Sequence, residues 1–150
     1  MTIKYKDFLR NQEAKAGPCP FCNMKEDIII ARNGLAYLTL ALAPYNKDHL
    51  LIIPTRHVKH IFDVTPEEHA AVRMLEKKAW DLLKSVGHSG VSFVVREGKS
   101  SGGTVEHLHY HAIPDTRLGN MDADGDERVV LSPKEHVAET NRFRDAYSKI

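Results

Sequence analysis

Short hydrophobic runs separated by polar breaks follow one another over residues 28–54. The runs IIIAR (28–32) and LAYLTLAL (35–42) flank Asn33-Gly34, a dipeptide that supplies the positive φ angles of a tight turn. This pattern predicts a β-hairpin. The runs LLIIP (50–54) and VSFVV (91–95) predict two further strands, the first of them ended by Pro54.

Residues 65–87 have the pattern of an amphipathic helix. Thr65, Pro66 and Glu68 form a capping-box start, and Gly87 is a plausible stop. Between them, hydrophobic residues recur at spacings of three and four, at Val72, Leu75, Ala79, Leu82 and Val86. A second capping box at Ser132–Glu135 predicts a terminal helix toward Tyr147.

The order of these elements is strands, one long helix, strands and one helix. It indicates an α+β fold with a mostly antiparallel β-sheet, one long helix and a C-terminal helix. A chain of 150 residues is typical of a single domain, residues 1–150. Residues 1–18 are then an N-terminal extension with one helical turn near 5–10, and 115–150 are a variable C-terminal tail whose first part, 115–127, is an exposed loop.

The net charge of +1, with histidine neutral, argues against a nucleic-acid polymer as the partner. The hydrophobic fraction of 42% is enough to fill a core. No stretch reaches the roughly 20 apolar residues that a membrane span needs, and the first residues lack the apolar centre of a signal peptide. We therefore expect a soluble, cytoplasmic protein that does not bind membranes.

The sequence HLHYH places His107, His109 and His111 at every second position. In a strand these three side chains share one face, and Leu108 and Tyr110 point to the other. Ile113-Pro114 limits a helix at this point, so a strand is the better interpretation. We call these three residues the histidine row.

Three interpretations of the histidine row remain open. It is a sheet face that happens to hold histidines, a catalytic metal site, or a nucleophilic centre in which one imidazole attacks phosphorus. A metal site needs further ligands, and only Glu106 and Asp115 are close in sequence. The preceding glycine loop (residues 98–106, GKSSGGTVE) favours the third interpretation, since accessible backbone N–H groups and hydroxyls bind anions. It is not a P-loop, because a predicted strand follows it where a P-loop is followed by a helix.

Two separated blocks resemble a known family. GGTVEHLHYHAIP (102–114) is similar to the signature of the histidine-triad (HIT) superfamily, and PYNKDHLLIIPTRH (44–57) is similar to its upstream block. The resemblance is strongest to the diadenosine-polyphosphate hydrolase and phosphorylase branches. It implies a HIT-like fold, a homodimer, and cleavage of a small nucleotide substrate at the α-phosphorus, with diadenosine polyphosphates as the leading substrate class.

The resemblance also implies roles for individual residues. His109 attacks and forms a nucleotidyl-histidine intermediate, His111 contacts the bridging or leaving oxygen, and His49 supports the catalytic centre. The phosphate-binding run matches Ser101, Gly102, Gly103 and Thr104. Four positions depart from the usual pattern, among them Ala41, where Asp or Asn binds ribose hydroxyls, and Gly103, where Gln is common; the others are Arg96 and Asp115. These departures keep open an alternative function, a nucleotide-binding or interaction module with weak activity.

Cys19 and Cys22 form the only Cys-x-x-Cys, within residues 19–22, which we call the cysteine knuckle. No strand–helix–strand pattern begins there, which argues against a thioredoxin-like redox pair. The remaining alternatives are two buried thiols or a zinc site, and zinc suits thiolate and imidazole ligands. The resemblance implies that His57 and His107 complete a structural four-ligand site, with His57 preferred to His60.

The other aromatic and histidine residues are assigned to simpler roles. Tyr110 is expected in the core, and Trp80 in the core or at a dimer contact. Four histidines are expected at the surface, namely His60, His69, His88 and His136.

Overall fold

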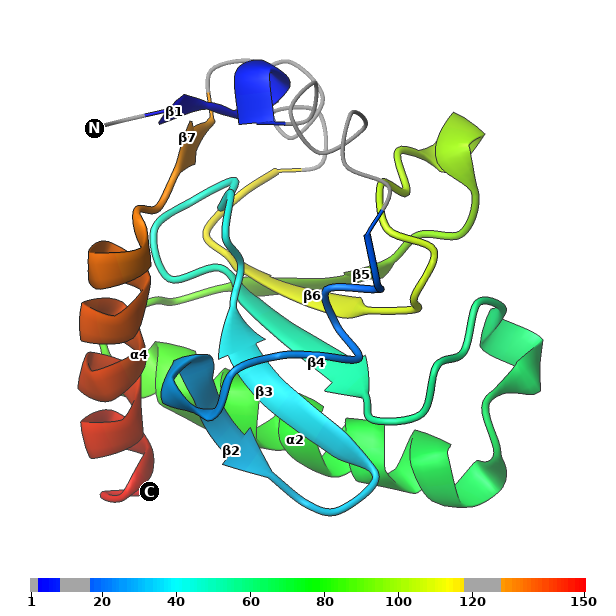
Figure 1. Cartoon of the computed structure of the whole chain (residues 1–150). Coiled ribbons are helices and arrows are strands. Elements are labelled where there is room, and N and C mark those ends of the chain that lie inside the picture. Colours follow the sequence, from blue (N-terminus) through cyan, green and yellow to red (C-terminus); the bar gives the residue numbers. More distant parts are fainter. Residues whose placement is uncertain (1–2, 9–16, 118–127) are drawn as a thin grey trace.

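The computed structural model describes residues 3–8, 17–117 and 128–150. Five strands form an antiparallel sheet in the order β2-β3-β4-β6-β5 (Figure 1). Their bounds are Ile29–Arg32 for β2, Ala36–Leu40 for β3, Leu50–Pro54 for β4, Val91–Val95 for β5 and Tyr110–Pro114 for β6. The long helix α2 (Pro66–Ser85) lies along one face of this sheet. The predicted α+β class with a mostly antiparallel sheet is confirmed.

The predicted hairpin forms between β2 and β3. Gly34 has a φ of +90°, which a side chain would disfavour, and the Asn33 amide donates to the Ala36 carbonyl (3.1 Å). The Asn33 side chain also donates to the Ala71 carbonyl in α2 (2.7 Å). The turn is thereby tied to the helix that covers the sheet.

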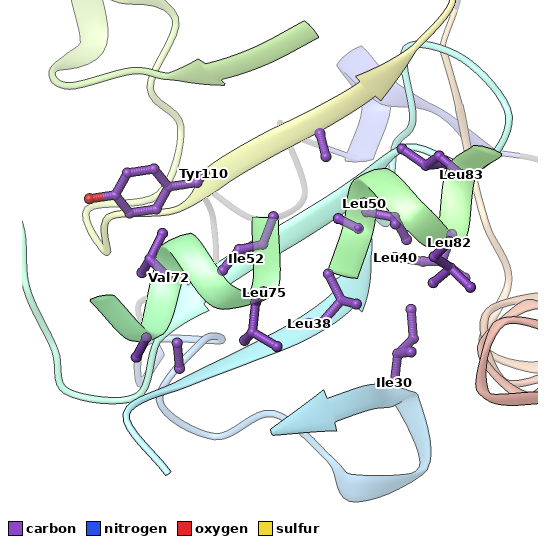
Figure 2. Close-up of a cluster of buried hydrophobic side chains, with 14 of the residues drawn as sticks. Ile30, Leu38, Leu40, Leu50, Ile52, Val72, Leu75, Leu82, Leu83 and Tyr110 are labelled. Carbon is purple, nitrogen blue, oxygen red and sulfur yellow. The ribbon is translucent and has the colours of Figure 1, made fainter. Parts of the chain in front are cut away.

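Helix α2 begins at the predicted capping box, in which the Thr65 hydroxyl and the Glu68 carboxylate each accept from the other residue's backbone N–H. Its hydrophobic stripe packs onto the sheet, as Figure 2 shows for Val72, Leu75 and Leu82 facing Leu38 and Ile52. Four of the five predicted stripe residues are buried, and Val86 is half-buried at the C-cap. Tyr110 belongs to this core, as predicted.

Helix α4 (Pro133–Tyr147) begins at the second predicted capping box, at Ser132 and Glu135. It packs against β2 and β3, so His136 is buried and its Nε2–H donates to the Leu40 carbonyl (3.1 Å). The predicted surface position of His136 is therefore wrong. His88 is also not a free surface residue, because Asp48 and Asp115 enclose its ring. His60 and His69 are exposed, as predicted.

Three 3-10 helices connect these elements: η1 (Glu26–Ile28), η2 (Ile61–Asp63) and η3 (Lys99–Ser101). A pairing not foreseen from the sequence joins the N-terminal segment to the segment before α4: β1 (Ile3–Lys4) pairs antiparallel with β7 (Val129–Val130). Residues 5–8 are helical, in agreement with the turn expected there. Most of the loop expected over 115–127 lies outside the described residues. No helix within the described ranges has the length and apolarity to span a bilayer.

Candidate active site and metal centre

The histidine row extends beyond the strand that holds it. Strand β6 begins only at Tyr110, so the predicted strand over 107–111 starts too early. His107 and His109 precede the ladder, because the Leu108 amide donates instead to the Val58 carbonyl outside the sheet (2.7 Å). The alternation of faces nevertheless holds. Leu108 and Tyr110 enter the core below α2, while the rings of His109 and His111 lie 4.9 Å apart, centroid to centroid.

The ring of His109 is buried and oriented by the backbone just before β6. Its Nδ1–H donates to the His107 carbonyl (2.8 Å), an assignment that follows because a carbonyl can only accept. The other ring nitrogen, Nε2, then carries the lone pair. Burial lowers the pKa of His109, so the ring is neutral near pH 7. A neutral imidazole with a free Nε2 is a competent nucleophile.

His49 and His111 form a directed pair. The Tyr45 amide donates to Nδ1 of His49 (3.2 Å), so the proton of His49 resides on Nε2. That Nε2–H donates to Nδ1 of His111 (2.9 Å), which leaves the proton of neutral His111 on its Nε2. Burial, reinforced by the charge of Arg128, lowers the pKa of His49 to about 3, and burial likewise lowers the pKa of His111. The pair therefore presents an N–H donor beside the ring of His109.

The loop before β4 carries His49 to this position. Asp48 adopts a positive φ of 72°, and the Asn46 side chain donates to the Pro114 carbonyl at the end of β6 (2.8 Å). The register of β4 with β6 places Leu50 opposite Ala112 and Leu51 opposite His111. His49, at the start of β4, consequently meets a side chain 62 residues further along the chain.

Backbone N–H groups of the glycine loop donate to carbonyl oxygens of the same loop. The amides of Ser101 (3.2 Å) and Gly103 (3.0 Å) donate to the Gly98 carbonyl, and the Gly102 amide donates to the Lys99 carbonyl (3.0 Å). A Cβ at position 103 would lie 2.9 Å from the Gly98 oxygen, so the closed loop requires glycine at this position. Phosphate contacts by residues 101–104 remain a prediction, since these three amides bond within the loop.

Cys19, Cys22, His57 and His107 come together as one group whose ligand atoms lie within 4.8 Å of one another. Nδ1 of His107 lies 3.4 Å and 3.5 Å from the two sulfurs, and Nδ1 of His57 lies 3.2 Å from the Cys22 sulfur. The Nε2–H of His107 donates to the Pro54 carbonyl (2.8 Å), which directs Nδ1 toward the thiols. Two sulfurs and two imidazole nitrogens are a ligand set that fits zinc.

The alternatives for these residues can now be compared. His60 bonds to Glu97 (2.6 Å) and lies outside the metal-ligand group. The interpretation of Cys19 and Cys22 as two buried thiols is wrong, because Cys22 is exposed. Within the described part of the chain, no second cluster of three or more potential metal ligands occurs, and Glu106 and Asp115 bond to Lys59 and His88 instead of the histidine row.

The structure shows which side chains surround Ala41 and Arg96, two of the residues that depart from the family pattern. Ala41 is buried in a small hydrophobic cluster with Tyr37, Leu51 and Ile53. Arg96 lies against the ring of Tyr45 and donates to its hydroxyl (2.8 Å). Sequence reasoning missed Tyr45, Arg128 and Phe21 as neighbours of the histidines. Phe21 packs its ring edge against His109, with ring centroids 5.0 Å apart.

Known proteins resemble the chain over this region. A model of the HIT domain family matches residues 23–118. The AP-4-A phosphorylase of Mycobacterium tuberculosis is 34% identical over 113 residues, which are 70% of this chain and 58% of that protein, so the chain spans little more than half the length of this relative. The adenosine 5'-monophosphoramidase of Schizosaccharomyces pombe is 31% identical over 100 residues, 64% of this chain and 73% of that protein.

A zinc-bound histidine triad family protein from Mycobacterium smegmatis has a similar structure. The TM-score is 0.68 at 23% sequence identity, and the likeness covers 87% of this chain and 94% of the other. This likeness confirms the fold.

Proposed function

Because this chain belongs to the HIT domain family, we propose that it cleaves a nucleoside phosphoanhydride or phosphoramidate at the α-phosphorus, with diadenosine polyphosphates as the leading substrate class. One observation carries the proposal: Nε2 of His109 is the free ring nitrogen, and the proton-bearing His111 lies beside it.

The reaction proceeds in two steps. The lone pair on Nε2 of His109 attacks the α-phosphorus, and the bond from phosphorus to the leaving oxygen or nitrogen breaks. The Nε2–H of His111 donates a hydrogen bond to that leaving atom and keeps its proton; a polyphosphate leaves as an anion, and an amine leaves from a nitrogen that is already protonated. His49 holds the His111 ring in the required tautomer. Phosphate, or water that loses its proton to the solvent, then attacks the phosphorus of nucleotidyl-His109; the bond from phosphorus to Nε2 breaks, which releases the nucleotide and restores the free ring.

Trapping the intermediate tests this function. Rapid acid-free quenching of the protein with a diadenosine polyphosphate is expected to yield a species heavier by one nucleotidyl group, observed by mass spectrometry of the intact chain. His109→Ala is expected to show neither the adduct nor turnover. Turnover by pure His109→Ala protein at the wild-type rate would refute the assignment of the nucleophile.

The group of two cysteines and two histidines supports a proposal about a bound metal ion. We propose a structural zinc ion held by the Cys19, Cys22, His57 and His107 group, since four protein ligands leave no position for substrate. The zinc ties the cysteine knuckle to the histidine row.

We also propose that the reacting partner is a small nucleotide, not a nucleic acid or a membrane, and that the compartment is the cytoplasm. Residues 1–150 act as one HIT-like domain.

A homodimer is also proposed. Strand β5 forms one edge of the sheet, and its Phe93 is 38% exposed beside a shallow cleft that also includes Trp80. Exposed apolar side chains at a sheet edge favour pairing with a second copy. Sedimentation analysis is expected to find a dimer in the wild type and a monomer in Phe93→Asp; a wild-type monomer would contradict the proposal.

The alternative function, a nucleotide-binding module with weak activity, is favoured by one position. The methyl group of Ala41 cannot bond to ribose hydroxyls, and it is buried among apolar side chains. A lost hydrogen bond to a ligand costs about 0.5–1.5 kcal/mol. Tight binding of a nucleoside monophosphate without turnover of any anhydride or phosphoramidate would support the module.

A further inference from the structure

Two arginines from distant parts of the chain share the ring of Tyr45. The guanidinium carbons of Arg96, which follows β5, and Arg128, which precedes β7, lie 5.3 Å and 4.0 Å from the ring centroid. Arg96 also donates to the Tyr45 hydroxyl (2.8 Å), and Arg128 lies 3.7 Å from the ring centroid of Tyr5. Cation–π contacts of this kind hold guanidinium groups in fixed places.

This stack borders the histidine row. The ring of Tyr45 stacks on His49 at 5.7 Å, with an angle of 27° between the ring planes, and His49 bonds to His111. Arg96 also reaches the glycine loop, because a Cβ at Gly102 would lie 3.1 Å from its Nη1 atom. Burial is the main cause of the low pKa of His111, and the neighbouring His49 and His109, followed by Arg96 and Arg128, lower it further.

Two carboxylates near Arg96 and Tyr45 in the sequence are bound elsewhere. Glu97 accepts from His60 and from the Ile61 amide, and Asp48 is held by His88 and Arg142. In the described ranges of the chain, no carboxylate forms an ion pair with Arg96. A planar guanidinium with free N–H groups beside a phosphorus centre is suited to bind phosphate oxygens in pairs.

We propose that Arg96 and Arg128, held on Tyr45, bind the phosphates of the leaving group and so select substrates with a polyphosphate leaving group over those with a neutral amine. This inference rests on the proposed function and names the side of the reaction that the two arginines serve. His111, which contacts the leaving atom, lies between the nucleophile and the stack. The sequence motifs alone assign neither arginine to the site.

Two substrates with the same nucleotidyl group separate this effect from the chemistry. Diadenosine tetraphosphate has a trianionic or more highly charged leaving group, and adenosine 5'-phosphoramidate releases ammonia. Arg96→Gln and Arg128→Gln are each expected to lower kcat/KM for the tetraphosphate by about tenfold or more, which is the usual effect of one lost charge-assisted bond. Both variants are expected to retain the phosphoramidase rate, and Arg96→Lys is expected to recover part of the loss.

Arg32→Gln is a matched control, because Arg32 lies 5.2 Å from the ring centroid of Tyr37 and pairs with Glu26 at the surface. It is expected to behave like wild type on both substrates. Equal losses on both substrates, or no loss on either, would overturn the proposal. If wild type turned over neither compound, the proposed function would fail separately. In that case, calorimetric binding of inorganic tripolyphosphate tests whether the two arginines form an anion site. Equal affinity in wild type and the Arg96→Gln/Arg128→Gln double variant would rule out this site.

Discussion

The Nε2 atom of His49 lies 2.9 Å from Nδ1 of His111, and the Tyr45 amide fixes which of the two nitrogens carries the proton. The bond therefore has a direction, from His49 to His111, and it leaves the proton of neutral His111 on its Nε2. A contact of this type lets a residue such as His49 orient the ring of its neighbour without itself touching the substrate.

Replacement of His49 is expected to weaken the hydrogen bond that His111 donates to the leaving atom. His49→Phe is expected to lower kcat by roughly 10- to 100-fold, the usual cost of losing an orienting partner, and His49→Gln to retain more activity because its amide can accept from Tyr45 and donate to His111. The measurement is kcat for nucleotidyl substrates with leaving groups of different pKa. A loss that is the same for aryl and alkyl leaving groups would show that His49 only supports the fold.

Zinc loss is expected to destabilise the whole protein. Purified protein is expected to contain about one zinc per chain, and His57→Ala is expected to lower both the zinc content and the Tm, because the proposed ion would join the cysteine knuckle to His107. His60→Ala is the matched control and is expected to retain the metal, since His60 bonds to Glu97. Elemental analysis and calorimetry provide the readouts. Abolition of turnover by a chelator at unchanged Tm would instead indicate a catalytic ion.

Phe21 is expected to act as a positioning residue for His109. Its ring edge packs on His109 and on His107, with centroids 5.0 Å and 5.8 Å away. Phe21→Ala is expected to lower kcat by roughly 10- to 100-fold at unchanged zinc content, because a small displacement of the reacting group has a cost of this size. Phe62→Ala removes an aromatic ring that is 96% exposed and is expected to leave kcat unchanged. Equal kcat values for the two variants would contradict the role of Phe21.

Gly103 is expected to be required for the shape of the glycine loop. Gly103→Ala places a Cβ 2.9 Å from the Gly98 carbonyl oxygen and forces the loop to open. We expect kcat/KM to fall by about tenfold or more, comparable to the loss of one or two well-placed bonds to phosphate. At Gly90 the added Cβ would meet Asp115 at an ordinary 3.6 Å, so steady-state kinetics of Gly90→Ala serve as the comparison. Wild-type kinetics for both variants would exclude a role for the closed loop.

His88 is expected to make stability depend on pH. Its Nε2 and Nδ1 atoms each lie 2.9 Å from a carboxylate, those of Asp48 and Asp115, and Asp48 is also paired with Arg142. Burial by itself lowers the pKa of His88, but the bonds to the two carboxylates outweigh it and raise the pKa above its ordinary value. The charged ring therefore stabilises the fold fully below the unfolded-state pKa of about 6.5, and this contribution disappears as pH rises through the folded-state pKa.

Urea unfolding of wild type and His88→Gln from about pH 5.5 to about pH 9 measures this contribution. The difference in free energy of unfolding is expected to be largest at the acidic end and to shrink as pH rises. His69→Gln removes an exposed histidine from α2 and controls for the loss of an imidazole as such. A difference that stays constant, or that grows with pH, would show that His88 is neutral in the fold.

The elements that could be predicted from the sequence are those whose signals are local. Thr65 and Glu68 meet within one helical turn, and Asn33-Gly34 bends the chain through its own φ angles, so both features were correctly predicted. The strand of the histidine row was placed too early, because strand bounds depend on the partner, and Leu108 bonds to Val58 outside the sheet. The buried position of His136 could not be foreseen, since it depends on where α4 docks.

The sequence by itself determined the hairpin, the two capped helices and the alternation that puts His109 and His111 on one face. Each of these depends on residues a few positions apart, where backbone geometry alone sets the outcome. Only the tertiary structure decided that His49 meets His111, that Cys19 meets His107 across 88 residues, and that Arg128 reaches Tyr45. Contacts at such separations follow from strand register and from the docking of segments, and both are set by the burial of the whole core.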